Sequence, residues 1–177
     1  MNYKKYKISN KLKTDVWQYL NETNIGNRYE ANGNKEEQFV GLVGEIIIKH
    51  LFNIKHEFNK GFDGGYDFTY KGFKIDVKTM GRNVDVKDYF VNNFIAFQKS
   101  YDCDIYIFCS LNKQKNELSI CGYLGKKELL KLATLYKKGD TRTRTNGTTF
   151  KMKTDTYEIK NNKLKNIEKL FYYLPKY

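Results

Sequence analysis

Asp67, Asp76 and Lys78 are the residues whose types and spacing are best suited to chemistry. They lie within residues 66–79, where two runs rich in aromatic and β-branched residues flank a Lys-Gly pair. This pattern predicts a β-hairpin with a tight turn, because Gly72 can adopt the positive φ that such turns need. With a two-residue turn, Asp67 lies opposite Asp76 on the face that also carries Lys78. The hairpin therefore brings two carboxylates and one ammonium group to one surface.

Directly opposed carboxylates have Cβ atoms about 4.5–5.5 Å apart and repel each other. A divalent cation between them removes the repulsion, and Mg²⁺ prefers oxygen ligands, often one or two carboxylates plus a substrate phosphate. The alternative is a solvated face of an antiparallel hairpin, on which Asp and Lys are ordinary, and a D-x-K triplet also occurs by chance. A bulge in the turn would shift the register by one residue and remove the opposition.

A third acid comes from an upstream helix. Apolar residues recur at three- and four-residue spacing over residues 35–52, which predicts a mostly buried helix. Gly41 and Gly44 within it suggest close approach to a neighbouring element. Glu45 lies on the narrow polar strip, and a carboxylate on such a helix needs a partner. The spacing leaves two alternatives open, a salt bridge to Lys49 one turn later and a role in an active site.

These residues resemble the PD-(D/E)xK nuclease superfamily, the restriction-endonuclease-like phosphodiesterases. The resemblance covers roughly residues 36–130 and consists of Glu45, Gly65-Tyr66-Asp67 and Asp76-Val77-Lys78, with Tyr66 where the motif has proline. It implies that Asp67 and Asp76 are metal ligands, aided by the Val77 carbonyl, and that Lys78 is the catalytic lysine. Glu45 would then be the accessory helix acid, holding a second cation or the hydrated shell of the first. The implied cofactor is Mg²⁺, with Mn²⁺ as a substitute.

The resemblance also implies a fold and a function. The fold is α/β, a restriction-endonuclease-like mixed central β-sheet of four strands flanked by helices, with the site at one edge. The function is that of a Mg²⁺-dependent DNA endonuclease, which hydrolyses phosphodiester bonds with metal-activated water. Two alternatives stay open, a non-catalytic nucleic-acid-binding protein on the same fold and a structure-selective or RNA-directed nuclease. Cleavage of both strands would favour a homodimer, since one carboxylate cluster cuts one strand at a time.

The charge of the chain also points to an anionic partner. The 177 residues carry a formal net charge of +12, and nucleic acid is the commonest partner of such proteins. Residues 126–177 hold 14 Lys and Arg against 5 Asp and Glu, a net charge of +9, so the positive charge is concentrated toward the C-terminal end. Biased codon usage is the alternative, because Lys is abundant whereas Arg appears only four times.

Four polar residues are candidates for contact with nucleic acid. Arg142 and Arg144 lie in a predicted loop of hydroxyl residues over residues 141–149, Lys151 follows it, and Gln98 ends an aromatic stretch. Arginine guanidinium groups are good donors to phosphate. The alternative is an ordinary solvated surface, which is compatible with nucleic-acid binding in the loop.

The remaining patterns predict a single nuclease-like domain over residues 1–177, with its core at about residues 36–130 and a basic C-terminal extension at residues 139–177. A loosely held arm (residues 1–10) precedes a short helix (14–20). Strands are predicted at residues 104–110, 118–124 and 154–160, helices at 126–138 and 162–174, and residues 84–99 fit either type of element.

The sequence also predicts where the protein works. No apolar run approaches the roughly 20 residues that a membrane span requires, and no signal peptide is visible at the N-terminus. The three cysteines have no zinc-site spacing and fit buried thiols in a reducing compartment. We therefore expect a cytoplasmic protein without a membrane partner.

Overall fold

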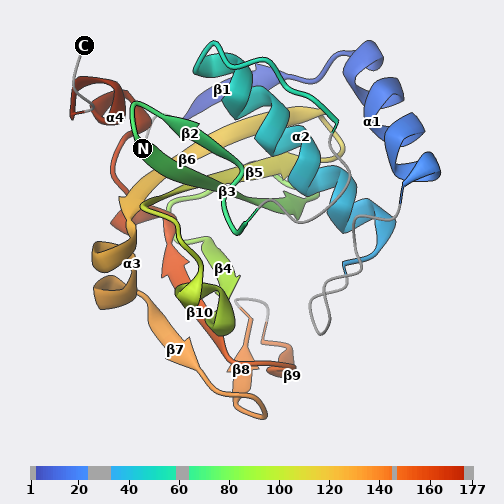
Figure 1. Cartoon of the computed structure of the whole chain (residues 1–177). Coiled ribbons are helices and arrows are strands. Elements are labelled where there is room, and N and C mark those ends of the chain that lie inside the picture. The colour runs from blue at the N-terminus through green and yellow to red at the C-terminus, as the bar shows by residue number, and fades with distance from the viewer. Residues whose placement is uncertain (1–2, 24–32, 59–63, 145–146, 174–177) are drawn as a thin grey trace.

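The computed structural model describes residues 3–23, 33–58, 64–144 and 147–173 (Figure 1). Its centre is a five-stranded mixed sheet in the order β1-β6-β5-β3-β2. These strands are β1 (Lys4–Lys7), β2 (Phe68–Tyr70), β3 (Phe73–Arg82), β5 (Ile105–Asn112) and β6 (Glu117–Gly125). Only the β3–β5 pair is parallel. Every residue of β5 is buried, as expected for a central strand covered on both faces.

Two helices cover one face of this sheet, α1 (Asn10–Glu22) and α2 (Lys35–Leu51) (Figure 1). The helix α2 begins with a capping box, in which the side chains of Asn34 and Glu37 each accept the other residue's backbone N–H. Its buried side chains, among them Val43 and Ile48, join Ile75 of β3 in one hydrophobic core. The periodicity of residues 35–52 therefore reflects burial against the sheet, and the predicted α/β class is confirmed.

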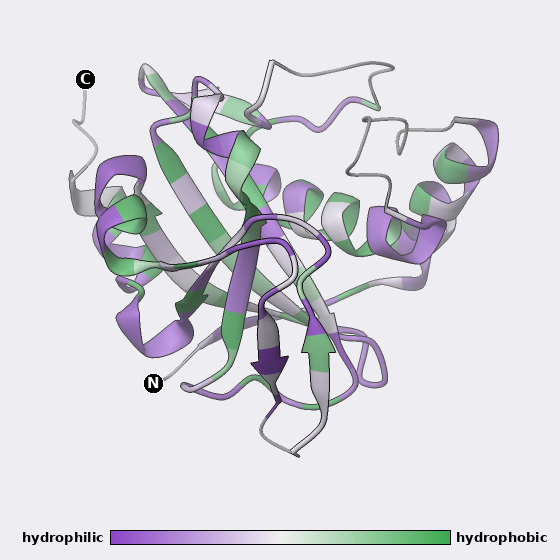
Figure 2. Ribbon diagram, turned by 90° about the horizontal axis from the view of Figure 1, so that it is seen from below, coloured by the Kyte–Doolittle hydropathy of each residue, from purple (hydrophilic) through white to green (hydrophobic). Residues whose placement is uncertain are grey.

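A second layer lies on the other side of the sheet (Figure 1). It contains a three-stranded sheet of β4 (Val91–Ile95), β10 (Thr156–Lys160) and β7 (Thr134–Tyr136), a two-stranded ribbon of β8 (Thr141–Thr143) and β9 (Thr149–Lys151), the 3₁₀ helices η2 (Ala96–Ser100) and η3 (Asn161–Lys163), and the helix α3 (Lys126–Leu132). The helix α4 (Ile167–Tyr173) lies on the side of α1 and α2, because its buried Ile167 and Leu170 belong to the core beneath α2. Hydrophobic and hydrophilic positions alternate along the strands (Figure 2), and a second cluster of buried side chains fills the space between the layers. The middle of β3, from Ile75 to Val77, is thus buried between the two layers.

Several sequence predictions differ from the structure. The arm at residues 1–10 contributes β1, which pairs with β6 and gives the central sheet five strands rather than four. The helix predicted at residues 126–138 ends at Leu132, because the following residues form β7 and pair with β10. The predicted loop at residues 141–149 contains β8 and the start of β9. None of the described helices is long and apolar enough to cross a membrane.

The two glycines of α2 differ in what lies next to them. A Cβ added at Gly44 would lie 1.9 Å from Thr79 Oγ1 on β3, whereas a Cβ added at Gly41 would meet nothing within 4 Å. We expect Gly44→Ala to lower the free energy of unfolding by about 1–3 kcal/mol through overpacking. Gly41→Ala should raise it by up to about 1 kcal/mol, since alanine favours a helix. Urea unfolding of both variants measures this, and equal effects would contradict close packing of α2 on β3.

Candidate active site

The hairpin that carries the candidate residues has the predicted register. Phe68 pairs with Ile75 and Tyr70 with Phe73. The turn residues Lys71 and Gly72 both have positive φ, 49° and 81°, as a two-residue type I′ turn requires. Alternation from this turn buries Phe68, Ile75 and Val77 in the core beneath α2 and turns Asp76 toward the opposite layer.

Asp67 lies just beyond the paired part of β2. Its backbone N–H donates to the Ile75 carbonyl over 2.8 Å, and its Oδ2 accepts the Val77 N–H over 2.6 Å. The side chain of Asp67 therefore substitutes for a neighbouring strand where β2 has ended. Because the N–H and C=O of one strand residue point to the same side, the Val77 carbonyl also faces this edge.

Asp76 and Lys78 form a close ion pair. Lys78 Nζ lies 2.7 Å from Asp76 Oδ2, and the two side chains are 21% and 6% exposed. The solvated-face alternative is therefore wrong, since Asp76 is buried. Burial acts to lower the pKa of Lys78, but the carboxylates of Asp76 and Asp67 outweigh it and raise the pKa above its ordinary value. Lys78 is thus a cation at neutral pH and not a general base.

The side chain of Asp67 is surrounded by more acidic than basic groups. Its pKa is raised well above the ordinary carboxyl value, first by burial and then by Asp76 and Glu45, while Lys78 and the Val77 N–H act in the opposite direction. Asp76 and Glu45 therefore both act on Asp67, and Lys78 offsets part of their effect. The described residues contain no group of three or more His, Cys, Asp or Glu side chains arranged to hold a metal ion. Two carboxylates and one backbone carbonyl are the donors available at this edge.

Glu45 forms the salt bridge that its spacing allows and also acts electrostatically on Asp67. Its Oε1 lies 2.6 Å from Lys49 Nζ, and it also raises the pKa of Asp67. The Nδ1 atom of His56 lies 3.6 Å from the same oxygen. Burial, with a smaller contribution from Lys49, lowers the pKa of His56 to about 4. His56 is therefore neutral at pH 7, and its contact with Glu45 is not an ion pair.

Two neighbours of Asp76 were missed by sequence reasoning. Tyr106 of β5 pairs with Asp76 in the parallel ladder, and Cys103 precedes that strand. Burial, with Asp76 as a smaller cause, raises the pKa of Cys103 to about 12 and also raises that of Tyr106. Tyr106 belongs to an apolar run that predicts only a core strand, and Cys103 stands just before that run between two aspartates. Finding them from sequence would have required the long-range register between β3 and β5.

The four candidates for nucleic-acid contact lie in the second layer. Arg142 donates to Glu158 Oε2 from Nε and Nη2, over 3.1 and 2.5 Å, and its guanidinium lies 4.3 Å from the Tyr136 ring centroid. Arg144 and Lys151 are exposed, whereas Gln98 is half-buried in η2. Arg142 is therefore held by the protein itself, and the two exposed cations are better placed for a partner.

We expect Arg142→Met to destabilise the protein. Glu158 is a buried carboxylate, and removing its partner leaves that charge uncompensated, which costs about 3 kcal/mol or more for a buried pair. Arg144→Met removes the same type of side chain from an exposed position and should change stability by no more than about 0.5 kcal/mol. Chemical unfolding of the two variants tests this. A small effect of both substitutions would show that the Arg142–Glu158 pair does not anchor the ribbon.

Asp67→Asn should change how stability depends on pH. An acid whose pKa is raised by folding contributes stability that is complete below the ordinary carboxyl pKa and is lost as the pH rises through the raised pKa. Asparagine cannot ionise, and its side-chain oxygen still accepts the Val77 N–H. We therefore expect the variant to be more stable than the wild type at neutral pH and the difference to shrink at about pH 4 and below. Urea unfolding across this range is the measurement, and a difference independent of pH would contradict it.

Comparison with known proteins gives no relative. No protein-family model, no curated protein and no solved structure matches the chain. What the site does must therefore be argued from its own geometry.

Proposed function

We propose that the protein is a Mg²⁺-dependent nuclease that hydrolyses phosphodiester bonds of DNA. The observation that supports this is the cluster at the edge of β3, in which Asp67 and Asp76 lie near each other and Lys78 bonds only one of them directly. An acid whose pKa is raised by burial and by neighbouring carboxylates, as that of Asp67 is, is frequent at functional sites. The same arrangement supports the resemblance to PD-(D/E)xK nucleases as part of this proposal.

Each residue of the site has a role that follows from its position. Asp67, Asp76 and the Val77 carbonyl would hold the cation. Glu45, which is close enough to raise the pKa of Asp67, would be the accessory acid. When bound, such an ion supplies Lewis-acid polarisation of the phosphate and a water of lowered pKa. Lys78 remains protonated and stabilises negative charge that builds on the phosphate in the transition state. The burial of Asp76 and the partial burial of Lys78 strengthen these electrostatic effects by limiting solvent screening.

Hydrolysis assays test the proposal directly. Purified protein is incubated with duplex DNA, branched DNA, single-stranded DNA and RNA, with Mg²⁺, with Mn²⁺ or with a chelator. We expect cleavage of DNA that requires the metal and is lost in chelator. Cleavage of RNA alone would support the RNA-directed alternative, and no cleavage of any substrate with either metal would refute the nuclease proposal.

A non-catalytic nucleic-acid-binding protein is the second candidate. One observation favours it, namely that Lys78 already bonds Asp76 at 2.7 Å, as in a structural ion pair. Calorimetric titration with Mn²⁺ separates the two candidates, because only the nuclease needs a cation at Asp67 and Asp76. For either candidate, the three free, buried cysteines fit the proposed reducing, cytoplasmic location.

A further inference from the structure

The ribbon of β8 and β9 pairs with neither of the larger sheets. The pairing of the two strands continues beyond them in both directions, as Gly139 N–H donates to the Met152 carbonyl and Arg144 N–H to the Thr148 carbonyl, over 2.9 and 2.8 Å. The ribbon lies on the opposite side of the molecule from α1 and α2 (Figure 1). A two-stranded hairpin has little stability of its own, so its orientation depends on how it is anchored.

One face of the ribbon provides the anchor. Arg142 and Phe150 are paired opposite each other on this face. The Arg142 guanidinium bonds Glu158 of β10 and lies over Tyr136 of β7, while Met152 at the base is buried. These contacts fix the ribbon on the three-stranded sheet and determine which face is turned outward.

The outward face carries hydroxyl groups and positive charge. Alternation places Thr141, Thr143, Thr149 and Lys151 on the face opposite Arg142, and all four are exposed. Toward the tip, Arg144 is exposed but lies by the same alternation on the face of Arg142 and Phe150, and its guanidinium lies 4.9 Å from the centroid of the Phe150 ring. Residues 141–151 include no acid. The ribbon therefore offers an anion one cation at the base of its outward face, Lys151, and one near its tip, Arg144.

The dimensions of the ribbon fit a groove of B-form DNA. The major groove is about 12 Å wide and admits a two-stranded ribbon. The stretch from residue 140 to residue 144 spans about 13 Å at the rise of a strand. Threonine hydroxyls donate to and accept from base edges, and threonine methyl groups contact the thymine methyl. Lysine and arginine bind phosphates or guanine.

We infer that the outward face of the β8–β9 ribbon enters the major groove of duplex DNA. Thr143 and Thr149 contact base edges, Lys151 and Arg144 bind the flanking phosphates, and Arg142 positions the ribbon through Glu158. This inference rests on the proposed function for the identity of the substrate. It adds the form of the DNA and the element that binds it.

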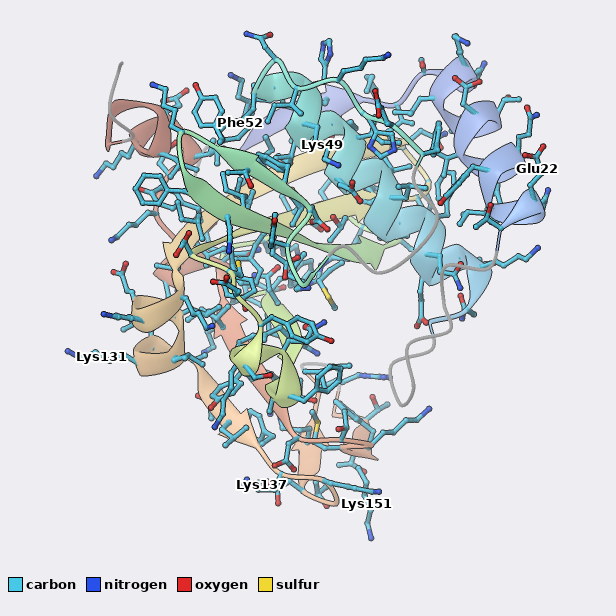
Figure 3. The ribbon with its side chains drawn as sticks, viewed as in Figure 1. Glu22, Lys49, Phe52, Lys131, Lys137 and Lys151 are labelled. Atoms are coloured by element: carbon cyan, nitrogen blue, oxygen red, sulfur yellow. The ribbon has the colours of Figure 1, made fainter. Side chains whose placement is uncertain are left out.

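Fluorescence anisotropy in chelator tests the cationic part of the inference without cleavage. The probes are duplex DNA and duplex RNA of one sequence, titrated at several salt concentrations. Arg144→Gln with Lys151→Gln should weaken binding to DNA and lower the slope of log affinity against log salt by about 1.8, since each phosphate contact contributes about 0.9. The matched control is Lys127→Gln with Lys131→Gln, which removes two exposed charges from α3, distant from Lys151 (Figure 3). The control should leave the slope unchanged.

Duplex RNA tests the groove itself. Its A-form major groove is too deep and narrow for side chains to enter. We therefore expect the wild type to bind duplex DNA more tightly than duplex RNA, and the ribbon variant to lose that preference. Equal binding of both duplexes by the wild type, or equal losses in the ribbon variant and the α3 control, would overturn the inference.

Thr143→Val with Thr149→Val tests the hydroxyl face while keeping side-chain shape and β propensity. We expect about a fivefold or greater loss of DNA affinity with the salt slope unchanged. An unchanged affinity would refute base-edge contact by this face. If the wild type cleaves DNA and the ribbon variants bind DNA normally, the nuclease proposal stands and the inference that the ribbon binds DNA is refuted. If DNA binding depends on the ribbon but no metal-dependent cleavage occurs, the inference about the ribbon stands and the nuclease proposal is refuted.

Discussion

Asp76→Asn should reduce Mg²⁺-dependent DNA cleavage by about 10³-fold or more. The substitution keeps the shape of a side chain that is 4% exposed but removes the charge that holds the cation. A bound cation contributes several kcal/mol to transition-state stabilisation, and each 1.36 kcal/mol or so is a factor of ten in rate. Single-turnover cleavage of a labelled duplex, with Mg²⁺ varied, measures the loss.

The variant should remain folded and should bind DNA in chelator at least as well as the wild type. Removing one carboxylate relieves repulsion of Asp67 and of the phosphate, and Lys78 retains Asp67 as a neighbouring charge. The matched control is Asp102→Asn. It removes an exposed carboxylate that is ion-paired with Lys74, a residue of β3 like Asp76 and Lys78. The control should cleave normally. Wild-type cleavage by Asp76→Asn would remove Asp76 from the mechanism.

Local sequence patterns predicted the parts of the site that depend on neighbouring residues. The Lys71-Gly72 turn fixes the hairpin register, and the periodicity of α2 places Glu45 beside the hairpin. Both signals come from short segments, in which turn chemistry and burial favour the same structure. The expectation of a mixed sheet with the site at one edge came with the resemblance.

The parts that could not be predicted depend on contacts between distant segments. The β1 strand is defined by pairing with β6, more than a hundred residues later. Residues 126–138 have helical periodicity, yet their second half pairs with β10, because a partner strand outweighs local propensity. The burial of Asp76 also depends on the second layer and on Tyr106. The sequence therefore identified the acids but not their burial, which is the largest cause of the raised pKa of Asp67.

Lys78→Met should also reduce the rate of cleavage, by about 10²-fold or more. It should leave metal binding intact. Lys78 is a cation and not a ligand, so its loss removes charge stabilisation from the transition state only. Because Lys78 bonds Asp76 at 2.7 Å, removing it also leaves a buried carboxylate without its closest positive charge. The affinity for Mn²⁺, measured by calorimetry, should therefore be unchanged or raised, whereas Asp76→Asn should lower it.

The stability of Lys78→Met distinguishes a metal site from a structural ion pair. Breaking a buried pair costs about 3–5 kcal/mol, so the variant should unfold at lower urea without metal. A cation that binds only the folded state adds stability with its concentration. Mg²⁺ should consequently stabilise Lys78→Met more than the wild type, because the ion takes over the charge balance of Asp67 and Asp76. Lys74→Met, on the same strand but at an exposed ion pair, should show no such gain. If Mg²⁺ leaves the stability of Lys78→Met unchanged, then Lys78 is only the counter-ion of a buried acid, and the non-catalytic alternative is favoured.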